Sequence, residues 1–209
     1  MNLDLRHSAV ATALVFVLLA AVSDKGLKER PDFPRSAGGM TALRSAASLI
    51  IRWPEEPRAL AGALLEKYGM PDEMVPSQLS WNDRRPWTKI VVFRDPEAAG
   101  RPRHLLESVA YGKITLQRWR ALSALGRGAS YDPVTQELSA RTDGEETNFL
   151  SVNLADEVIR GRRSAAAARD FYDETANLSL YGKSSPYMTR LLFEPRRRTL
   201  PKLTGAGGT

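Results

Sequence analysis

The chain has 209 residues, of which 43% are hydrophobic and 26% charged, which suits one ordinary hydrophobic core. This composition excludes both a disordered polymer and a membrane protein with several spans. The absence of cysteine excludes disulfides, thiolate catalysis and thiolate metal sites, and the two histidines, His7 and His104, form no cluster. No glycine pattern matches a nucleotide-binding loop, so we expect no cofactor.

The positive charge is concentrated at the C-terminal end. Of a net charge of +6, residues 183–209 contribute six Lys or Arg against one Glu. A nucleic-acid-binding domain usually carries its positive charge on the folded body, and this body is nearly neutral, so a nucleic-acid partner is not predicted. The run Arg196, Arg197 and Arg198 indicates either a solvated tail or a contact with anionic lipid headgroups.

An uncharged stretch of 15 residues lies near the N-terminus, at 8–22. A helix of this length covers about 22 Å, short of a bilayer core of about 30 Å, and it has the size of a signal-peptide core. We therefore predict that residues 1–23 are a signal peptide, with cleavage before Asp24 and an exported, periplasmic location. A short uncleaved membrane anchor, favoured by the cations that follow the stretch, and a soluble protein with an apolar N-terminus are the alternatives.

Proline and glycine punctuate the next segment, 24–57, which predicts a linker containing a short helix at 40–51. The folded body is predicted to span 58–182. It begins with a helix at 58–68, because apolar residues recur at helical spacing and Pro57 suits a first turn.

A hairpin and a third strand follow the first helix. Apolar residues alternate with polar ones before a turn at 82–86, and an apolar run follows it, which predicts paired strands at 78–81 and 87–94. A further strand is predicted at 105–111.

The second half of the body is predicted to contain three helices and another hairpin. The helices are expected at 116–125 with Thr115 as cap, from Asp143 to about 160, and from Ser164 to about 180. The hairpin is expected from strands at 130–131 and 137–140. The resulting class is α+β: a small antiparallel sheet of two hairpins plus a strand, packed on helices, with a C-terminal helix pair and a basic extended tail at 183–209.

One group of residues has the types needed for hydrolytic or metal chemistry. His104 precedes Glu107 by three residues, and Asp95 lies shortly before both. A zinc site needs a third ligand, and a histidine base needs a nucleophile and an orienting group, and no spacing supplies either. A surface histidine is therefore the favoured interpretation, with a hydrolase that uses His104 as an alternative.

Polar and aromatic residues in apolar surroundings are interpreted as structural. Asn148 and Asn153 fall in a largely apolar helix, so we expect their side chains to be hydrogen-bonded inside the fold. Trp81, Trp87 and Trp119 lie near arginines, and packing of large rings in the core is favoured over stacking on bases or sugars.

Several segments resemble a group of bacterial exported proteins of unknown function. The similarity begins with Glu-Lys-Tyr-Gly-Met-Pro-Asp-Glu at 66–73 and Pro-Trp-Thr-Lys-Ile-Val-Val-Phe-Arg at 86–94. It continues through Asn-Phe-Leu-Ser-Val-Asn-Leu-Ala at 148–155 and Gly-Arg-Arg-Ser at 161–164 to Phe171 and Tyr172, and so covers roughly the body. The resemblance implies export and brings no reaction with it.

Together these observations predict a non-catalytic exported protein, periplasmic or membrane-associated, that binds another envelope component. Alternatively, the chain is an accessory subunit of a membrane protein complex and is held by a single N-terminal anchor. In both cases an envelope or membrane protein is the expected partner.

Overall fold

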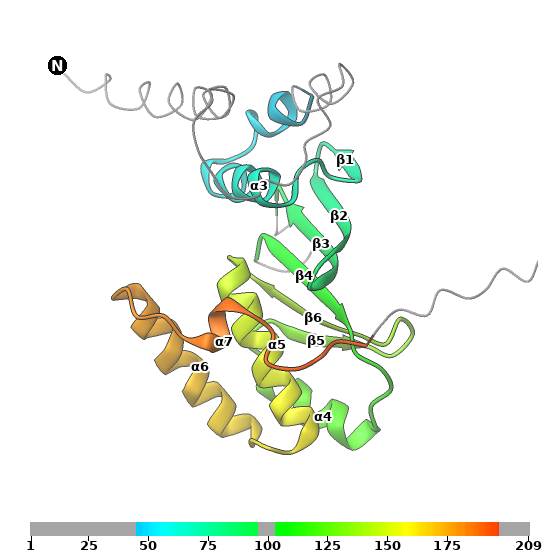
Figure 1. The fold of residues 1–209 in the computed structure, drawn as a ribbon, viewed down its shortest axis with the longest axis vertical. Coiled ribbons are helices and arrows are strands. Elements are labelled where there is room, and N and C mark those ends of the chain that lie inside the picture. Colours follow the sequence, from blue (N-terminus) through cyan, green and yellow to red (C-terminus); the bar gives the residue numbers. More distant parts are fainter. Residues whose placement is uncertain (1–44, 96–102, 197–209) are drawn as a thin grey trace, which may run out of the picture. The chain divides into compact units, whose positions relative to one another are not determined.

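The computed structural model describes residues 45–95 and 103–196. In this part of the chain a six-stranded antiparallel sheet packs against helices (Figure 1), so the predicted α+β class is confirmed. The strands are β1 (Glu73–Val75), β2 (Gln78–Arg84), β3 (Trp87–Phe93), β4 (Leu105–Ala110), β5 (Ala129–Asp132) and β6 (Glu137–Thr142). The helices are α3 (Glu55–Tyr68), α4 (Leu116–Leu125), α5 (Glu145–Arg160), α6 (Ala165–Leu180) and α7 (Pro186–Thr189), and residues 45–50 are also helical.

Three predictions fall largely or wholly outside the described residues. They are the signal peptide or anchor at 1–23, the N-terminal part of the linker up to residue 44, and the tail beyond residue 196.

The strands follow the order β1-β2-β3-β4-β6-β5. Both predicted hairpins are present, and β6 pairs with β4 so that β5 lies at the edge. The edge strand β1 was not predicted, because its three residues are exposed or half-buried and show no apolar alternation. The turn between β2 and β3 is shorter than predicted, since pairing continues to Arg84 opposite Trp87.

One face of the sheet carries the core. Successive side chains of a strand point to opposite faces, so Leu105, Glu107 and Val109 of β4 share a face, and all three are fully buried. Helix α5 contacts β4, β5 and β6 along this face, while α3 contacts β2 and β3. A carboxylic acid is thus enclosed in the middle of an otherwise apolar layer.

Two of the three predicted helix caps are confirmed. The Thr115 and Ser164 hydroxyls accept hydrogen bonds from the backbone N–H groups of Arg118 and Ala167, at 3.3 and 3.1 Å. The predicted Asp143 cap is wrong, because the Asp143 carboxylate pairs with Arg103 and Gly144 occupies the cap position.

The hydrophobic core extends beyond both ends of the predicted 58–182 body. Upstream, Ala46, Ile50 and Trp53 are at most 3% exposed. Downstream, Met188 is buried and the residues around it pack on α5. We call residues 185–196, which include α7, the C-terminal strap.

A single asparagine fastens this strap to α5. The Asn153 amide donates to the backbone carbonyls of Tyr187 and Arg190 at 3.0 and 2.8 Å. Its carbonyl accepts from the backbone N–H of Leu192 at 2.8 Å. Because all three bonds are to backbone groups, Asn153 fixes the path of the strap independently of the side chains that the strap carries.

Candidate functional site

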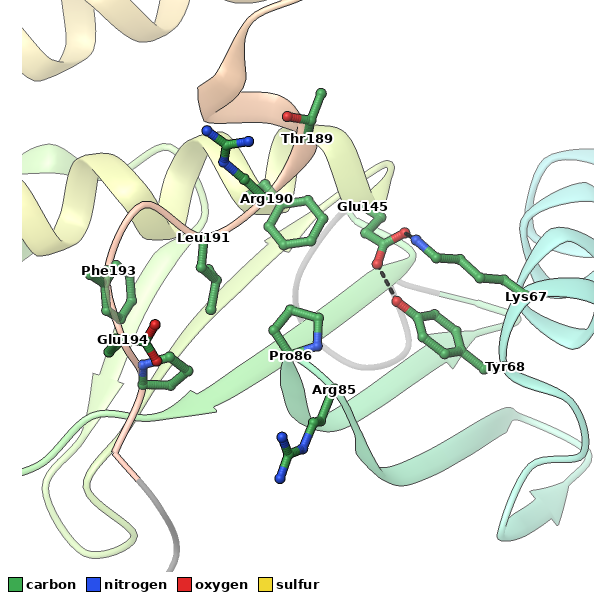
Figure 2. Close-up of a pocket in the computed structure, with 12 residues that line it drawn as sticks. Lys67, Tyr68, Arg85, Pro86, Glu145, Thr189, Arg190, Leu191, Phe193 and Glu194 are labelled. Atoms are coloured by element: carbon green, nitrogen blue, oxygen red, sulfur yellow. Dashed lines mark hydrogen bonds and ion pairs between the residues drawn. The ribbon is translucent and has the colours of Figure 1, made fainter. Parts of the chain in front are cut away.

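An open groove of about 440 Å³ lies where the C-terminal strap passes the start of α5, the end of α3 and the turn between β2 and β3 (Figure 2). Pro86, Phe149, Leu191 and Phe193 give it apolar surfaces. Its full lining comprises Lys67, Tyr68, Arg85, Pro86, Glu145, Phe149, Thr189, Arg190, Leu191, Phe193, Glu194 and Pro195.

Glu145 is the most densely hydrogen-bonded side chain of the groove. Its carboxylate pairs with the Lys67 ammonium and accepts from the Tyr68 hydroxyl, and the Trp87 indole N–H donates to it at 3.0 Å. Figure 2 shows the carboxylate directed toward Tyr68 and Lys67. Glu145 also lies in the first turn of α5, where the partial positive charge of the helix end favours an anion. With three donors and a helix terminus, this carboxylate has little capacity left for a ligand.

A second carboxyl group lies nearby, inside the core. Glu107 is fully buried, and the Asn148 amide donates to its Oε2 at 2.9 Å. Its Oε1 has no hydrogen-bond partner among the described residues. Burial, followed by the charge of Glu145, raises the pKa of Glu107 well above its ordinary value. Burial thus favours the protonated form of Glu107, and its side chain does not line the groove.

Tyr68 is held in its protonated form. Burial first, and then its hydrogen bond to Glu145, raise the pKa of the Tyr68 phenol. The phenol accordingly serves as a fixed donor to Glu145. Tyr68 and Glu145 are therefore hydrogen-bonded to each other in the wall of the groove.

The rim of the groove is cationic. Lys67 and Glu145 offset each other, whereas the exposed Arg85 and Arg190 form no ion pair with any acid in the described ranges. Glu194, the other carboxylate of the lining, is exposed and also forms no ion pair within those ranges. Two arginines against one free carboxylate leave an excess positive charge beside apolar walls.

The structure separates the residues that the sequence suggested for hydrolysis. His104 lies just before β4, where its Nδ1 is 3.0 Å from the carbonyl of Phe93 and its Nε2 is 3.8 Å from Glu56. Glu107 points into the core and contacts Asn148 instead. Asp95 is exposed and ends the first described range. Within the described ranges, no hydrogen bond or ion pair joins any two of the three candidates.

The arginine run is only partly described. The Arg196 backbone N–H donates to the carbonyl of Ala110 at 2.9 Å, and its side chain lies over Gly112. Arg197 and Arg198 lie outside the described residues.

The structural interpretation of the polar and aromatic residues is confirmed with one exception. Asn148 and Asn153 are buried and hydrogen-bonded, and Trp81 and Trp87 are at most 1% exposed. Trp119 is 40% exposed, so the prediction that it packs in the core is wrong. The side chains in the first half of α4 are exposed. The buried residues of this helix, Leu122 and Leu125, lie in its second half.

Sequence reasoning missed the groove and the role of Glu145. Its partners Trp87, Tyr68 and Lys67 lie 58, 77 and 78 residues away along the chain. The only local signal was an acidic residue in the first turn of a helix, which is common on solvated helix ends.

Comparison with protein-family models, with curated proteins and with solved structures gives no match for this chain. In residues 45–95 and 103–196 no helix is both long and apolar enough to cross a membrane. The same ranges contain no group of three or more metal-ligating side chains placed to hold an ion.

Proposed function

We propose that this chain is a non-catalytic, exported binding protein, and that its groove binds an extended acidic segment of another envelope protein. The observation that carries the proposal is that apolar walls lie beside Arg85 and Arg190, which form no ion pair with an acid among the described residues. An extended segment with carboxylates beside apolar side chains complements both features. The saturated hydrogen bonding of Glu145 supports a rigid wall rather than a reacting group.

Export is supported by the sequence. The uncharged stretch at 8–22 has the size of a signal-peptide core, and small residues precede Asp24. The alternative of an accessory subunit with a single anchor differs in one measurable property. An alkaline carbonate wash releases an exported soluble protein from envelope membranes, whereas an anchored subunit stays in the pellet.

Site-directed photo-crosslinking in the native cells tests the groove. The photoreactive residue benzoylphenylalanine replaces Thr189, which is exposed and lines the groove. The matched control carries it at Leu180, which is 80% exposed on α6 and does not line the groove. We expect a discrete adduct from position 189 and none from position 180, and an acidic segment in the crosslinked peptide.

Charge reversal makes the test specific. In the Arg85→Glu/Arg190→Glu variant the adduct at position 189 is expected to disappear, while the urea midpoint stays close to that of the parent because both residues are exposed. An adduct that survives the double reversal, or equal adducts from positions 189 and 180, contradicts the proposal.

A further inference from the structure

The first half of α4 forms a second surface, none of whose α4 residues lines the groove, and it exposes apolar side chains beside cations. Leu116 is 58% and Trp119 is 40% exposed. Residues three and four positions apart share a helix face, so Arg120 stands with Leu116 and Trp119. An aliphatic group, an indole and a guanidinium thus face outward together.

Further cations gather around this helix start. Lys113 and Arg118 are exposed, and neither forms an ion pair with a described acid. The Arg118 guanidinium covers Gly161 at the end of α5, where an added Cβ would lie 2.5 Å from its Nη1 and φ is +74°. A side chain at position 161 would be strained at this φ, and the close approach places the Arg118 guanidinium beside the cations that flank Gly161.

Those flanking cations are Arg160 and Arg162. Both pair with Asp156, which is 1% exposed, yet their own side chains are 50% and 52% exposed. One buried carboxylate therefore offsets only one of two outward guanidinium groups. Together with Lys113, Arg118 and Arg120, they give one end of the α4–α5 pair a marked positive charge, and Figure 1 shows the start of α4 beside the end of α5.

From this juxtaposition we infer that the start of α4 is a docking surface for an anionic lipid bilayer, with Leu116 and Trp119 entering the headgroup region and the surrounding cations contacting lipid phosphates. Tryptophan prefers the membrane interface, where its ring is buried and its N–H stays hydrated. Each Lys or Arg near an anionic surface strengthens binding about fivefold.

The same residues fit nucleic acid less well. Single-stranded nucleic acid is bound by several aromatic side chains on which successive bases stack. Of the large exposed hydrophobics in the described ranges, only Trp119 and Tyr181 are aromatic, and Tyr181 lies at the end of α6. The exposed residue beside Trp119 is the aliphatic Leu116, which offers no ring on which a base could stack.

The tryptophans provide a specific readout. The chain has four, and Trp53, Trp81 and Trp87 are at most 3% exposed. Quenching of tryptophan fluorescence by lipids brominated on the acyl chain therefore reports on Trp119. The full chain is mixed with vesicles of phosphatidylglycerol and phosphatidylcholine, and separately with phosphatidylcholine alone. We expect quenching only with the anionic vesicles and its loss on Trp119→Phe.

Two matched variants complete the experiment. Arg118→Glu/Arg120→Glu is expected to weaken vesicle binding by about 25-fold or more. The control Arg52→Glu/Arg94→Glu also reverses two exposed cations, which lie outside α4 and α5, and it is expected to change binding less than twofold. Comparable urea midpoints for the two variants exclude unfolding as the cause.

Three results would overturn the inference. The first is no quenching of Trp119 although vesicles are bound, which means that another part of the chain holds the membrane. The second is equal quenching with neutral and anionic vesicles. The third is binding of a single-stranded oligonucleotide that depends on Arg118 and Arg120 in the absence of vesicle binding.

Discussion

The two ends of α5 stabilise a carboxylate in different ways. Glu145, in the first turn, is 16% exposed and relies on two neutral donors, one ammonium and the favourable helix terminus. Asp156, in the last two turns, is 1% exposed and receives two guanidinium groups and the Tyr111 hydroxyl, at 2.8 Å. The helix dipole favours an anion only at the first end. A buried anion near the other end therefore depends on direct ion pairs, whereas the first end tolerates an open groove beside it.

The largest effect is expected at the Asp156 end. Asp156→Ala removes the hydrogen bonds that Arg160, Arg162 and Tyr111 make to a buried carboxylate and should lower the free energy of unfolding by about 3 kcal/mol. Glu145→Ala should cost only about 1 kcal/mol, because water from the groove reaches the donors that Glu145 leaves. Urea unfolding measures both. Equal losses for the two variants would refute the contrast between the helix ends.

Loss of the strap clamp is expected to come next. Asn153→Ala removes three hydrogen bonds to the strap backbone and should lower the local stability of residues 185–196 by about 2 kcal/mol. Hydrogen exchange at the Leu192 amide measures this loss. Asn153→Asp, which keeps an acceptor for that amide, should lose less protection there. Unchanged exchange in the alanine variant would show that the strap is held by other contacts.

The buried acid beneath the groove is expected to make stability depend on pH. The pKa of Glu107 is raised in the folded state, so the folded protein binds more protons than the unfolded chain once the pH exceeds about 4.3. The free energy of unfolding should therefore fall as the pH rises above that value, by at most about 1.4 kcal/mol per pH unit, until Glu107 ionises in the folded state.

Glu107→Gln tests this dependence. Glutamine does not ionise, so the free energy of unfolding of this variant should fall less with rising pH than that of the parent. The difference in stability between the variant and the parent should therefore increase in favour of the variant in urea titrations between pH 5 and 9. Glu146→Gln, at an exposed acid in the first turn of α5, is the control. Parallel profiles for the parent and Glu107→Gln would mean that Glu107 is not held in its protonated form.

The smallest effect is expected at Tyr68. Tyr68→Phe removes one donor to Glu145 and leaves Lys67 and Trp87 in place, so the cost should be about 1 kcal/mol. Tyr181→Phe, at an 82% exposed position, should be neutral within about 0.5 kcal/mol. The two variants can be compared by urea unfolding, and identical midpoints would argue against a structural role for the Tyr68 hydroxyl.

Local chemistry made much of the fold predictable. Apolar periodicity located α3, α4, α5 and α6, and a hydroxyl just before α4 or α6 marked its start. Alternation before a turn predicted the first hairpin, and turn-forming residues predicted the second. These signals work because each depends on residues within one or two turns of each other.

The wrong or missing predictions concern contacts between residues that are far apart in the sequence. Asp143 was expected to cap α5, but Arg103, 40 residues away, takes its carboxylate. Trp119 was expected in the core because large aromatic rings are usually buried, yet it lies in the exposed first half of α4, before the buried Leu122 and Leu125. The groove is formed by residues of α3, the turn before β3, the start of α5 and the C-terminal strap. These segments are far apart in the sequence, so no local sequence pattern predicts that they lie together.

The central claim is that this chain acts as an exported binding protein, and the N-terminus of the native protein tests it most directly. Intact-mass and N-terminal analysis of the protein recovered from the periplasmic fraction should show a chain that begins at Asp24. A chain that retains Met1 and is recovered from the cytosolic fraction would contradict the account.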